Sequence, residues 1–278
     1  MELLSTDPSY AGFLIVDLIA IVGLVGAMRW LSRFLVKPVN VHSEASNIET
    51  SAAVIALMLA LTGVASGTFS LTLLDEWLLV TGYGLLAIVL LRLGAWLQDK
   101  IVLPALNLSF ATRQGNVAAA LITGAHLIGT AIVIQSSMKW ASQDANLGLI
   151  ALLLGFIISQ FLLALETRLR LLWTGGGLIE AIEKKQTTVI LKATFQHIGA
   201  AMAISGSAHF ASALEYQLEL AVLAWLFSSI IFLVAYLALA EICVRLILPK
   251  NKTIEEGRAT LEGAIYLGWG FILPALAS

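Results

Sequence analysis

Eight long apolar runs fill most of the 278-residue sequence and restrict its fold more than any other feature. Each run is long enough to cross the hydrocarbon core of a bilayer, which takes about 20 apolar residues of helix. Inside lipid the backbone must satisfy its own hydrogen bonds, and runs of this length do so as helices. The runs lie at 10–35, 49–69, 74–99, 115–138, 146–171, 188–208, 216–247 and 257–276. The first lacks a basic leader and a cleavage site, so we expect a retained membrane anchor.

The composition agrees with a protein whose solvent is the lipid bilayer. The sequence is 59% hydrophobic and 12% charged, whereas soluble domains carry about 25% charged residues. We therefore predict an all-α fold, a polytopic membrane helix bundle of eight transmembrane helices that forms one integral membrane domain over residues 1–278. The lone cysteine, Cys243, excludes an internal disulfide and a zinc cluster built on thiolates. The net charge of −2 offers no basic field for nucleic acid.

The distribution of positive charge predicts the orientation. Of the 16 Lys and Arg residues, only Lys139 falls on one side of the predicted spans. Loops rich in Lys and Arg stay in the cytoplasm, so the other side is expected to be cytoplasmic. This places both termini outside the cytoplasm, with multiple passes of the membrane between them.

The helices also form an internal repeat. Four segments with a polar start and an apolar continuation recur at nearly even spacing, at 46–67, 113–132, 185–204 and 254–273. We infer four parallel copies of a two-helix hairpin, related by an axis near the membrane normal. The copies span 10–69, 74–138, 146–208 and 216–276. The second helix of each copy is richer in Gly, Ala and Ser, which allow close packing in lipid, so we expect these helices inside the bundle.

A short motif at the start of these segments carries a family resemblance. It is fullest in the second copy, at Gly115, Asn116, Gly124 and Gly129. The fourth copy keeps Glu255 and Gly257, but Arg258 replaces the Asn. With this motif the chain resembles the YjfL family of bacterial inner-membrane proteins, a domain of unknown function. The resemblance implies an integral membrane protein, and it brings no substrate or catalytic residue.

Two histidines stand out among the polar residues at membrane depth, where ionisable side chains are costly and often functional. His126 and His197 lie about ten residues into the fourth and sixth predicted helices, at nearly equivalent places in two repeats. If both helices line the interior, the imidazoles can relay protons, bind a metal or ligate a haem. The alternative is interhelical hydrogen bonding that only fixes the packing, with Gln196, Thr123 and Thr194 as partners. We expect no metal site, because no carboxylate cluster accompanies the pair.

Two carboxylates lie at similar depth. Glu262 shares a helix face with Glu255 and Arg258, so it can bind a cation or carry a proton, or it can be neutralised by Arg258 at spacing i, i+4. Asp17 has no basic neighbour in its own helix, and it either lines a water-filled vestibule or makes a buried hydrogen bond.

Two further carboxylates are paired by sequence spacing. Glu166–Arg170 and Glu241–Arg245 are both i, i+4 pairs at the inner ends of helices. We expect both pairs to neutralise themselves while the Arg side chains extend towards the membrane surface.

Three functions stay open. The first is ion or small-solute transport along a polar path between the small-residue helices. The second is a non-enzymatic envelope protein with a structural or signalling role, acting through the membrane or a cytoplasmic protein partner bound by the basic loops. The third is a redox subunit with the histidines as haem ligands. No P-loop, H-E-x-x-H or G-x-S-x-G motif occurs, so we expect no enzyme and no cofactor. Assembly as a homo-oligomer also stays open.

Overall fold

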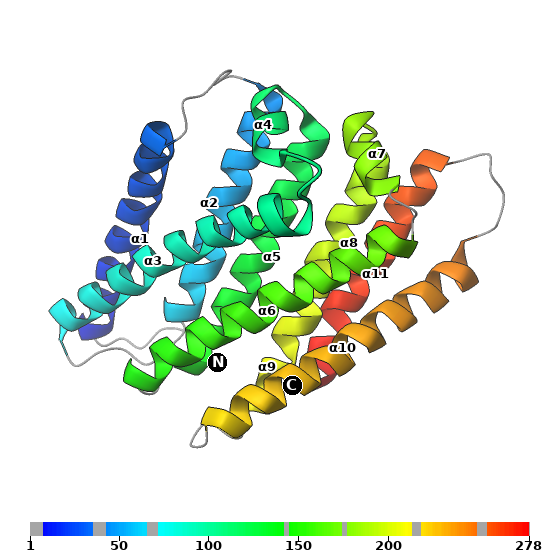
Figure 1. Ribbon diagram of the computed structural model, residues 1–278. Helices are drawn as coiled ribbons and strands as arrows, with labels where there is room; N and C mark the ends of the chain where they lie inside the picture. The colour runs from blue at the N-terminus through cyan, green and yellow to red at the C-terminus, as the bar shows by residue number, and fades with distance from the viewer. Residues whose placement is uncertain are drawn as a thin grey trace.

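The computed structural model describes residues 8–35, 43–65, 72–141, 145–173, 177–212, 218–248 and 255–277, and this part of the chain is helical without a strand (Figure 1). The predicted all-α membrane helix bundle is confirmed. The long helices are α1 (Pro8–Leu35), α2 (Glu44–Ala65), α3 (Leu73–Leu97), α5 (Val117–Ala141), α6 (Ala145–Trp173), α8 (Thr187–Gly206), α10 (Leu218–Ile247) and α11 (Glu255–Ala277). The short ones are α4 (Leu108–Arg113), α7 (Gly177–Glu183), α9 (Ala208–Ser212) and the π-helical turn η1 (Gln98–Val102) that extends α3.

Seven of the described helices are long and apolar enough to cross a membrane. They contain the spans Ala11–Met28, Glu44–Val64, Leu73–Val102, Val117–Met138, Leu152–Trp173, Glu219–Ile247 and Gly257–Leu276. The predicted run 188–208 corresponds to α8, which is not among the seven. Its 20 residues include Lys192, Gln196 and His197, and these polar side chains lower its hydropathy. The helix nevertheless lies within the bundle, packed between α5 and α11.

The long helices form two layers. In one layer α2, α5, α8 and α11 stand side by side in that order, and in the other α3, α6 and α10 cross them obliquely (Figure 1). Helix α1 packs mainly against α3 at one end of the molecule. In the span of α5, 83% of the residues are buried, against 22% for both α1 and α11. The prediction that small-residue helices lie inside is therefore right for α5 and wrong for α11, because α11 ends the row and has a neighbour on one side only.

Small residues let the helices of the row approach closely. A Cβ atom added at Gly124 of α5 would lie 2.9 Å from the Cβ of Ala52 in α2. One added at Gly129 would lie 3.1 Å from the Cβ of Ala201 in α8. Both distances are shorter than ordinary side-chain contacts, so these two motif glycines set the spacing of α5 from both neighbours.

The other half of the motif forms a corner between two helices. Gly115 adopts a positive φ of 85° between α4 and α5, a conformation that glycine accepts without strain. Asn116 follows as the N-cap residue: its side-chain oxygen accepts from the backbone N–H of Ala119 at 3.2 Å. Lys185 and Gln186 repeat this corner between α7 and α8, with a φ of 55° at Lys185. In both corners the capping residue's N–H bonds to the carbonyl five residues earlier.

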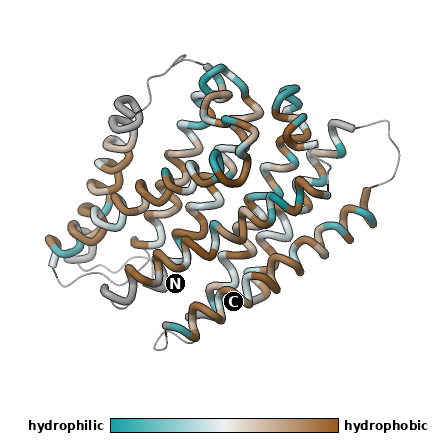
Figure 2. Tube along the Cα trace, viewed as in Figure 1, coloured by the Kyte–Doolittle hydropathy of each residue, from teal (hydrophilic) through white to brown (hydrophobic). Residues whose placement is uncertain are grey.

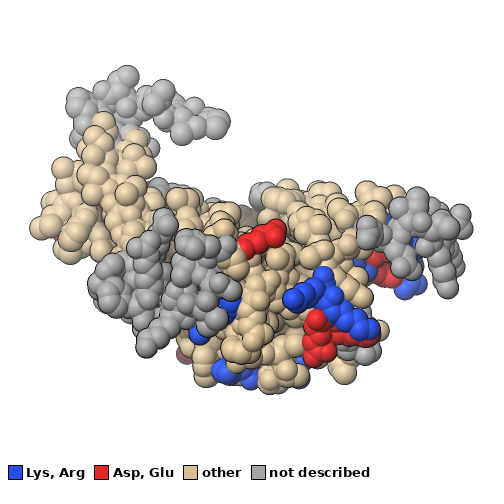
Figure 3. Space-filling view, turned by 90° about the horizontal axis from the view of Figure 1, so that it is seen from above, with Lys and Arg blue, Asp and Glu red and all other residues tan. Residues whose placement is uncertain are grey.

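Polar residues gather at one end of the bundle. Figure 2 shows hydrophobic colours along α1, α3 and α10, and hydrophilic colours around α4 and α7. Seen onto this end, Figure 3 shows Lys and Arg side chains beside Asp and Glu side chains on a mostly uncharged surface. The described part of this end is therefore mixed in charge and presents no broad field of one sign.

Candidate functional site

The two predicted histidines meet at the centre of the bundle. The Nδ1 atom of His126 in α5 lies 3.1 Å from the Nε2 atom of His197 in α8. The ring centroids are 5.2 Å apart with the planes tilted by 38°. Both residues are buried, with exposed fractions of 2% and 5%. Gly129 lies beside this contact: an added Cβ there would be 3.4 Å from the His197 ring, an ordinary van der Waals distance.

The outer nitrogen of each imidazole has a partner in the crossing layer. His126 Nε2 lies 2.9 Å from the carbonyl oxygen of Gly94 in α3. His197 Nδ1 lies 3.4 Å from the hydroxyl of Thr167 and 3.6 Å from Oε2 of Glu166, both in α6. The pair therefore connects four helices through hydrogen bonds, two from each layer.

Glu166 joins this site to a buried cation. Its Oε1 atom accepts a hydrogen bond from Arg170, which also donates to the carbonyl of Ala193 in α8 at 2.9 Å. The two side chains are 1% and 12% exposed. The predicted i, i+4 pair is present, but the expectation that Arg170 extends to the surface is wrong. A backbone carbonyl of the neighbouring helix holds the guanidinium inside the protein, as buried charges require.

A second polar link lies beside the imidazoles. Gln160 of α6 donates to the hydroxyl of Thr130 in α5 at 3.0 Å, and both residues are buried. Thr130 lies one turn beyond His126 and also borders Gly94.

We call His126, His197, Glu166, Thr167 and Arg170 the imidazole network, with Gly94 and Ala193 as its carbonyl ends.

The proposed partners of the histidines on their own helices are not used. The backbone carbonyl of Gln196 accepts a hydrogen bond from the hydroxyl of Tyr236 in α10 at 2.9 Å, and the Gln196 side chain lies near the hydroxyl of Tyr266 in α11. The hydroxyls of Thr123 and Thr194 are buried and have no hydrogen-bond partner among the described residues. The prediction that these three residues bond to the imidazoles is therefore wrong, because α3 and α6 supply the partners instead.

The predicted carboxylates lie apart from the imidazole network. Glu262 of α11 is held by Arg258 at 2.8 Å, as the spacing predicts, and also by Lys192 of α8. Asp17 of α1 is 4% exposed, and its Oδ1 has no hydrogen-bond partner in the described part of the chain. Helix α1 packs on α3 and α2, so Asp17 does not reach the centre. The Glu255 side chain lies outside the described residues.

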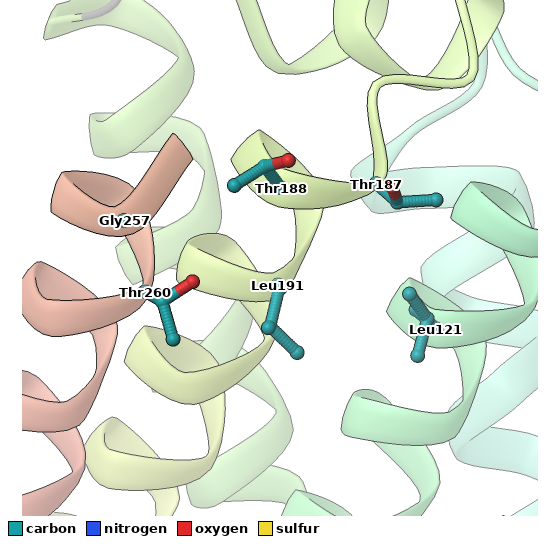
Figure 4. Close-up of a pocket in the computed structure, with 6 residues that line it drawn as sticks. All are labelled: Leu121, Thr187, Thr188, Leu191, Gly257 and Thr260. Carbon is teal, nitrogen blue, oxygen red and sulfur yellow. The ribbon is translucent and has the colours of Figure 1, made fainter. Parts of the chain in front are cut away.

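The motif residue Gly257 borders a surface pocket. This pocket of about 390 Å³ lies between the first turns of α8 and α11 and one side of α5 (Figure 4). It is lined by Leu121, Thr187, Thr188, Leu191, Gly257 and Thr260. None of these residues belongs to the imidazole network, so the pocket is a separate feature.

The arrangement does not favour metal or haem ligation. In the described ranges no group of three His, Cys, Asp or Glu side chains is placed to hold a metal ion. Three of the four imidazole nitrogens face a hydrogen-bond partner within 3.1 Å, and the fourth faces Thr167 at 3.4 Å. An axial ligand needs a nitrogen that points at open space, which a ring in such contacts does not offer. The contact between the two rings allows them to hold and exchange a proton, or to fix the packing of the helices by hydrogen bonds.

Comparison with family models finds a match to one segment of the chain. Residues 72–147 match the model of a family described as a domain of unknown function, DUF350. The matched segment runs from the N-cap residue of α3 to the start of α6, so it contains Gly94, the motif corner and His126. Neither the comparison with curated proteins nor the comparison with solved structures finds a match. The match covers the predicted second hairpin only, and the closer resemblance to the YjfL family stays a prediction.

Sequence reasoning found the histidines but missed most of their partners. A carbonyl such as that of Gly94 has no sequence signal, because every residue carries one. Glu166 and Arg170 were visible as a pair, yet their link to His197 depends on how α6 is rotated. The available signal was that α6 and α8 belong to one predicted hairpin, which brings Glu166 and Thr167 near the depth of His197.

Proposed function

We propose that this chain is a multi-pass protein of the bacterial inner membrane that moves protons across it, with the imidazole network as the intramembrane proton site. The observation that carries the proposal is the contact of His126 with His197, buried in α5 and α8 and continued to Glu166. Buried imidazoles that bond to each other can exchange a proton without a change in helix packing. Ionisable groups at this depth are costly and are kept where they handle ions or protons.

The proposal includes eight spans in four parallel hairpins with both termini outside. Helix α8 supports the eighth span, since it lies in the row between α5 and α11, two helices that qualify by composition. The matching corners at Gly115–Asn116 and Lys185–Gln186 support the repeat in the second and third copies. Fusions at the C-terminus test the orientation: alkaline phosphatase should be active and green fluorescent protein dark. The reverse result would contradict the assignment of the termini.

Proton flux in proteoliposomes tests the function. Purified protein is reconstituted with a pH-sensitive dye inside, and a potassium gradient with valinomycin imposes an inside-negative potential. We expect acidification with the wild type and the rate of empty liposomes with His197→Gln. The matched control is His209→Gln, since His209 lies in the short helix α9 and is exposed. Circular dichroism and gel filtration check that each variant is folded.

Two results would reject proton transport. One is the absence of flux above empty liposomes at any imposed gradient. The other is an unchanged flux in folded His197→Gln, which would move the proton path away from the imidazole network. Reduced flux in His209→Gln as well would point to a general effect of reconstitution rather than to the site.

A structural or signalling role in the envelope is the second candidate, and the ends of the network favour it. The chain of hydrogen bonds stops at the carbonyls of Gly94 and Ala193, which accept protons in hydrogen bonds but do not pass them on. On this alternative the network only locks four helices together. Variants of His126 and His197 would then lower the thermal stability, and no flux would be found in any sample.

A further inference from the structure

The tautomer of His126 follows from its partner in α3. The carbonyl of Gly94 can only accept a hydrogen bond, so the Nε2 atom of His126, 2.9 Å away, must carry a proton. In its neutral form His126 therefore has an unprotonated Nδ1. The bond of 3.1 Å to His197 then has a single arrangement, in which His197 Nε2 donates to His126 Nδ1. One backbone carbonyl thus determines the hydrogen placement in both rings.

The last nitrogen, Nδ1 of His197, can be bare or protonated. It faces the Thr167 hydroxyl at 3.4 Å and Glu166 Oε2 at 3.6 Å. The hydroxyl also lies 3.4 Å from Glu166 Oε2, so its single proton has two acceptors. When Nδ1 is bare, the hydroxyl donates to His197. When Nδ1 is protonated, it donates to Thr167 or Glu166 and the hydroxyl turns to the carboxylate. The two arrangements differ by one proton.

An added proton can be shared across the bond between the rings, and Glu166 decides where the charge lies. If His126 took it up, His197 would become neutral with its proton on Nδ1. The Coulomb attraction to the Glu166 carboxylate falls with distance. His197 faces this carboxylate directly, whereas His126 is one ring further away and faces two uncharged groups, the Gly94 carbonyl and the Gln160 side chain. The positive charge is therefore more stable on His197.

The other charged and titratable groups around His197 do not change this preference of the positive charge for His197 over His126. From α6, Arg170 faces the opposite oxygen of Glu166. From α10, Tyr236 bonds to the backbone carbonyl of the residue before His197. On α8 itself, Lys192 lies more than a turn away and is paired with Glu262 of α11. Glu166 is therefore the carboxylate that contacts the imidazole pair in the described residues.

We infer that the imidazole network binds a single proton at Nδ1 of His197, with Thr167 as the hydroxyl that reorients on loading and His126 as a neutral positioning residue locked by Gly94. The inference rests on the proposed function in assigning this proton as the one transported. The occupancy of the site itself does not depend on transport, so it can be measured separately. In the unloaded state the site has no net charge, because Glu166 and Arg170 cancel, and loading adds one positive charge.

Nitrogen-15 NMR of histidine-labelled protein in nanodiscs tests the inference. The chain has four histidines, and the variants His42→Gln and His209→Gln remove the two outside the network to simplify the spectrum. The spectra are recorded over a pH series from about pH 4 to 9, and we expect the proton gained by the pair to appear at Nδ1 of His197. His126 should keep a protonated Nε2 and a bare Nδ1 throughout. The measurement uses an intact network and does not require that a disrupted variant folds.

The same measurement on variants of two α6 residues supplies a second test. Glu166→Gln should lower the proton affinity of His197 by about tenfold or more, one pH unit being a tenfold change. Thr167→Ser keeps the hydroxyl and should titrate like the wild type, whereas Thr167→Val should shift the midpoint.

Three results would overturn the inference: titration of His126 instead of His197, a protonated Nδ1 on neutral His126, or no titration of either ring in this range. Proton flux with any of these results would reject the inference alone. Titration of His197 without flux would reject transport and leave a proton-binding site.

Discussion

The ion pair at the end of the imidazole network makes the sharpest stability prediction. Arg170→Met removes the cation next to Glu166 but keeps a side chain of similar length. Glu166 is 1% exposed, so its carboxylate would remain inside the protein without a counter-charge. Removing one partner of a buried ion pair costs about 3–5 kcal/mol, mostly because the other charge stays desolvated. We expect the free energy of unfolding to fall by about this amount.

The double variant Glu166→Gln/Arg170→Met separates the charge effect from lost packing. With a neutral amide in place of the carboxylate, the unpaired charge is gone and most of the stability should return. A remaining loss of about 1 kcal/mol is expected for the missing hydrogen bond from Arg170 to Ala193. The measurement is equilibrium unfolding in mixed micelles of increasing SDS fraction, followed by tryptophan fluorescence and circular dichroism.

The chain offers a matched control in the pair of Glu241 with Arg245. It has the same i, i+4 spacing, but its side chains are 45% and 77% exposed. Exposed pairs contribute about 0–1 kcal/mol, so Arg245→Met should have little effect. The reasoning fails if Arg170→Met costs no more than Arg245→Met, or if the double variant is less stable than Arg170→Met alone.

Three further predictions test the corners and the helix contacts. In thermal unfolding, Asn116→Ala should cost about 1–2 kcal/mol of stability, since Asn116 caps α5 and also donates a hydrogen bond to the carbonyl of Ile182 at 2.9 Å. Gln186→Ala removes no capping bond, so it should be nearly neutral in the same measurement. Gly129→Leu should cost about 1–3 kcal/mol by overpacking α5 against α8, and NMR should show the contact between the imidazoles lost. The hydrogen bond with Lys184, and then its charge, lowers the pKa of Glu180 from 4.5. Lys184→Met should return this pKa towards 4.5. In the wild type, the small contribution of the pair to the free energy of unfolding should disappear as the pH falls through the folded pKa of Glu180.

The membrane-spanning helices could be predicted because the bilayer imposes their length. The run predicted at 146–171 is α6 at Ala145–Trp173, and the run at 74–99 is α3 with its π-helical extension. The short helices α4 and α7 were not predicted, since six or seven residues carry too little apolar periodicity to detect. They are built from the corners, in which one residue with positive φ joins two helices.

The meeting of the histidines could be predicted from the repeat that the sequence suggests, but the network around them could not. His126 and His197 are 71 positions apart and lie at the same depth in adjacent helices of the row. Equal depth in equivalent helices follows from sequence alone, and small residues such as Gly129 indicate which helices approach closely. The rotation of α3 and α6 does not follow, because most residues of both helices are apolar and their few polar residues do not form a continuous stripe in the sequence.

The pairs at Glu166–Arg170 and Glu241–Arg245 show how the layer position of a helix decides the role of the same motif. Each pair ends the first helix of a predicted hairpin, and their spacing in the sequence does not distinguish their roles. Helix α6 lies inside its layer with contacts to α5, α8 and α10, so its carboxylate is enclosed and adjoins an imidazole. Helix α10 lies at the end of that layer. The Glu241 side chain there is 45% exposed, and it accepts a hydrogen bond from the hydroxyl of Tyr266 at 3.0 Å. The same i, i+4 pair is therefore enclosed in the helix that has neighbours on both sides and exposed in the helix at the end of the layer.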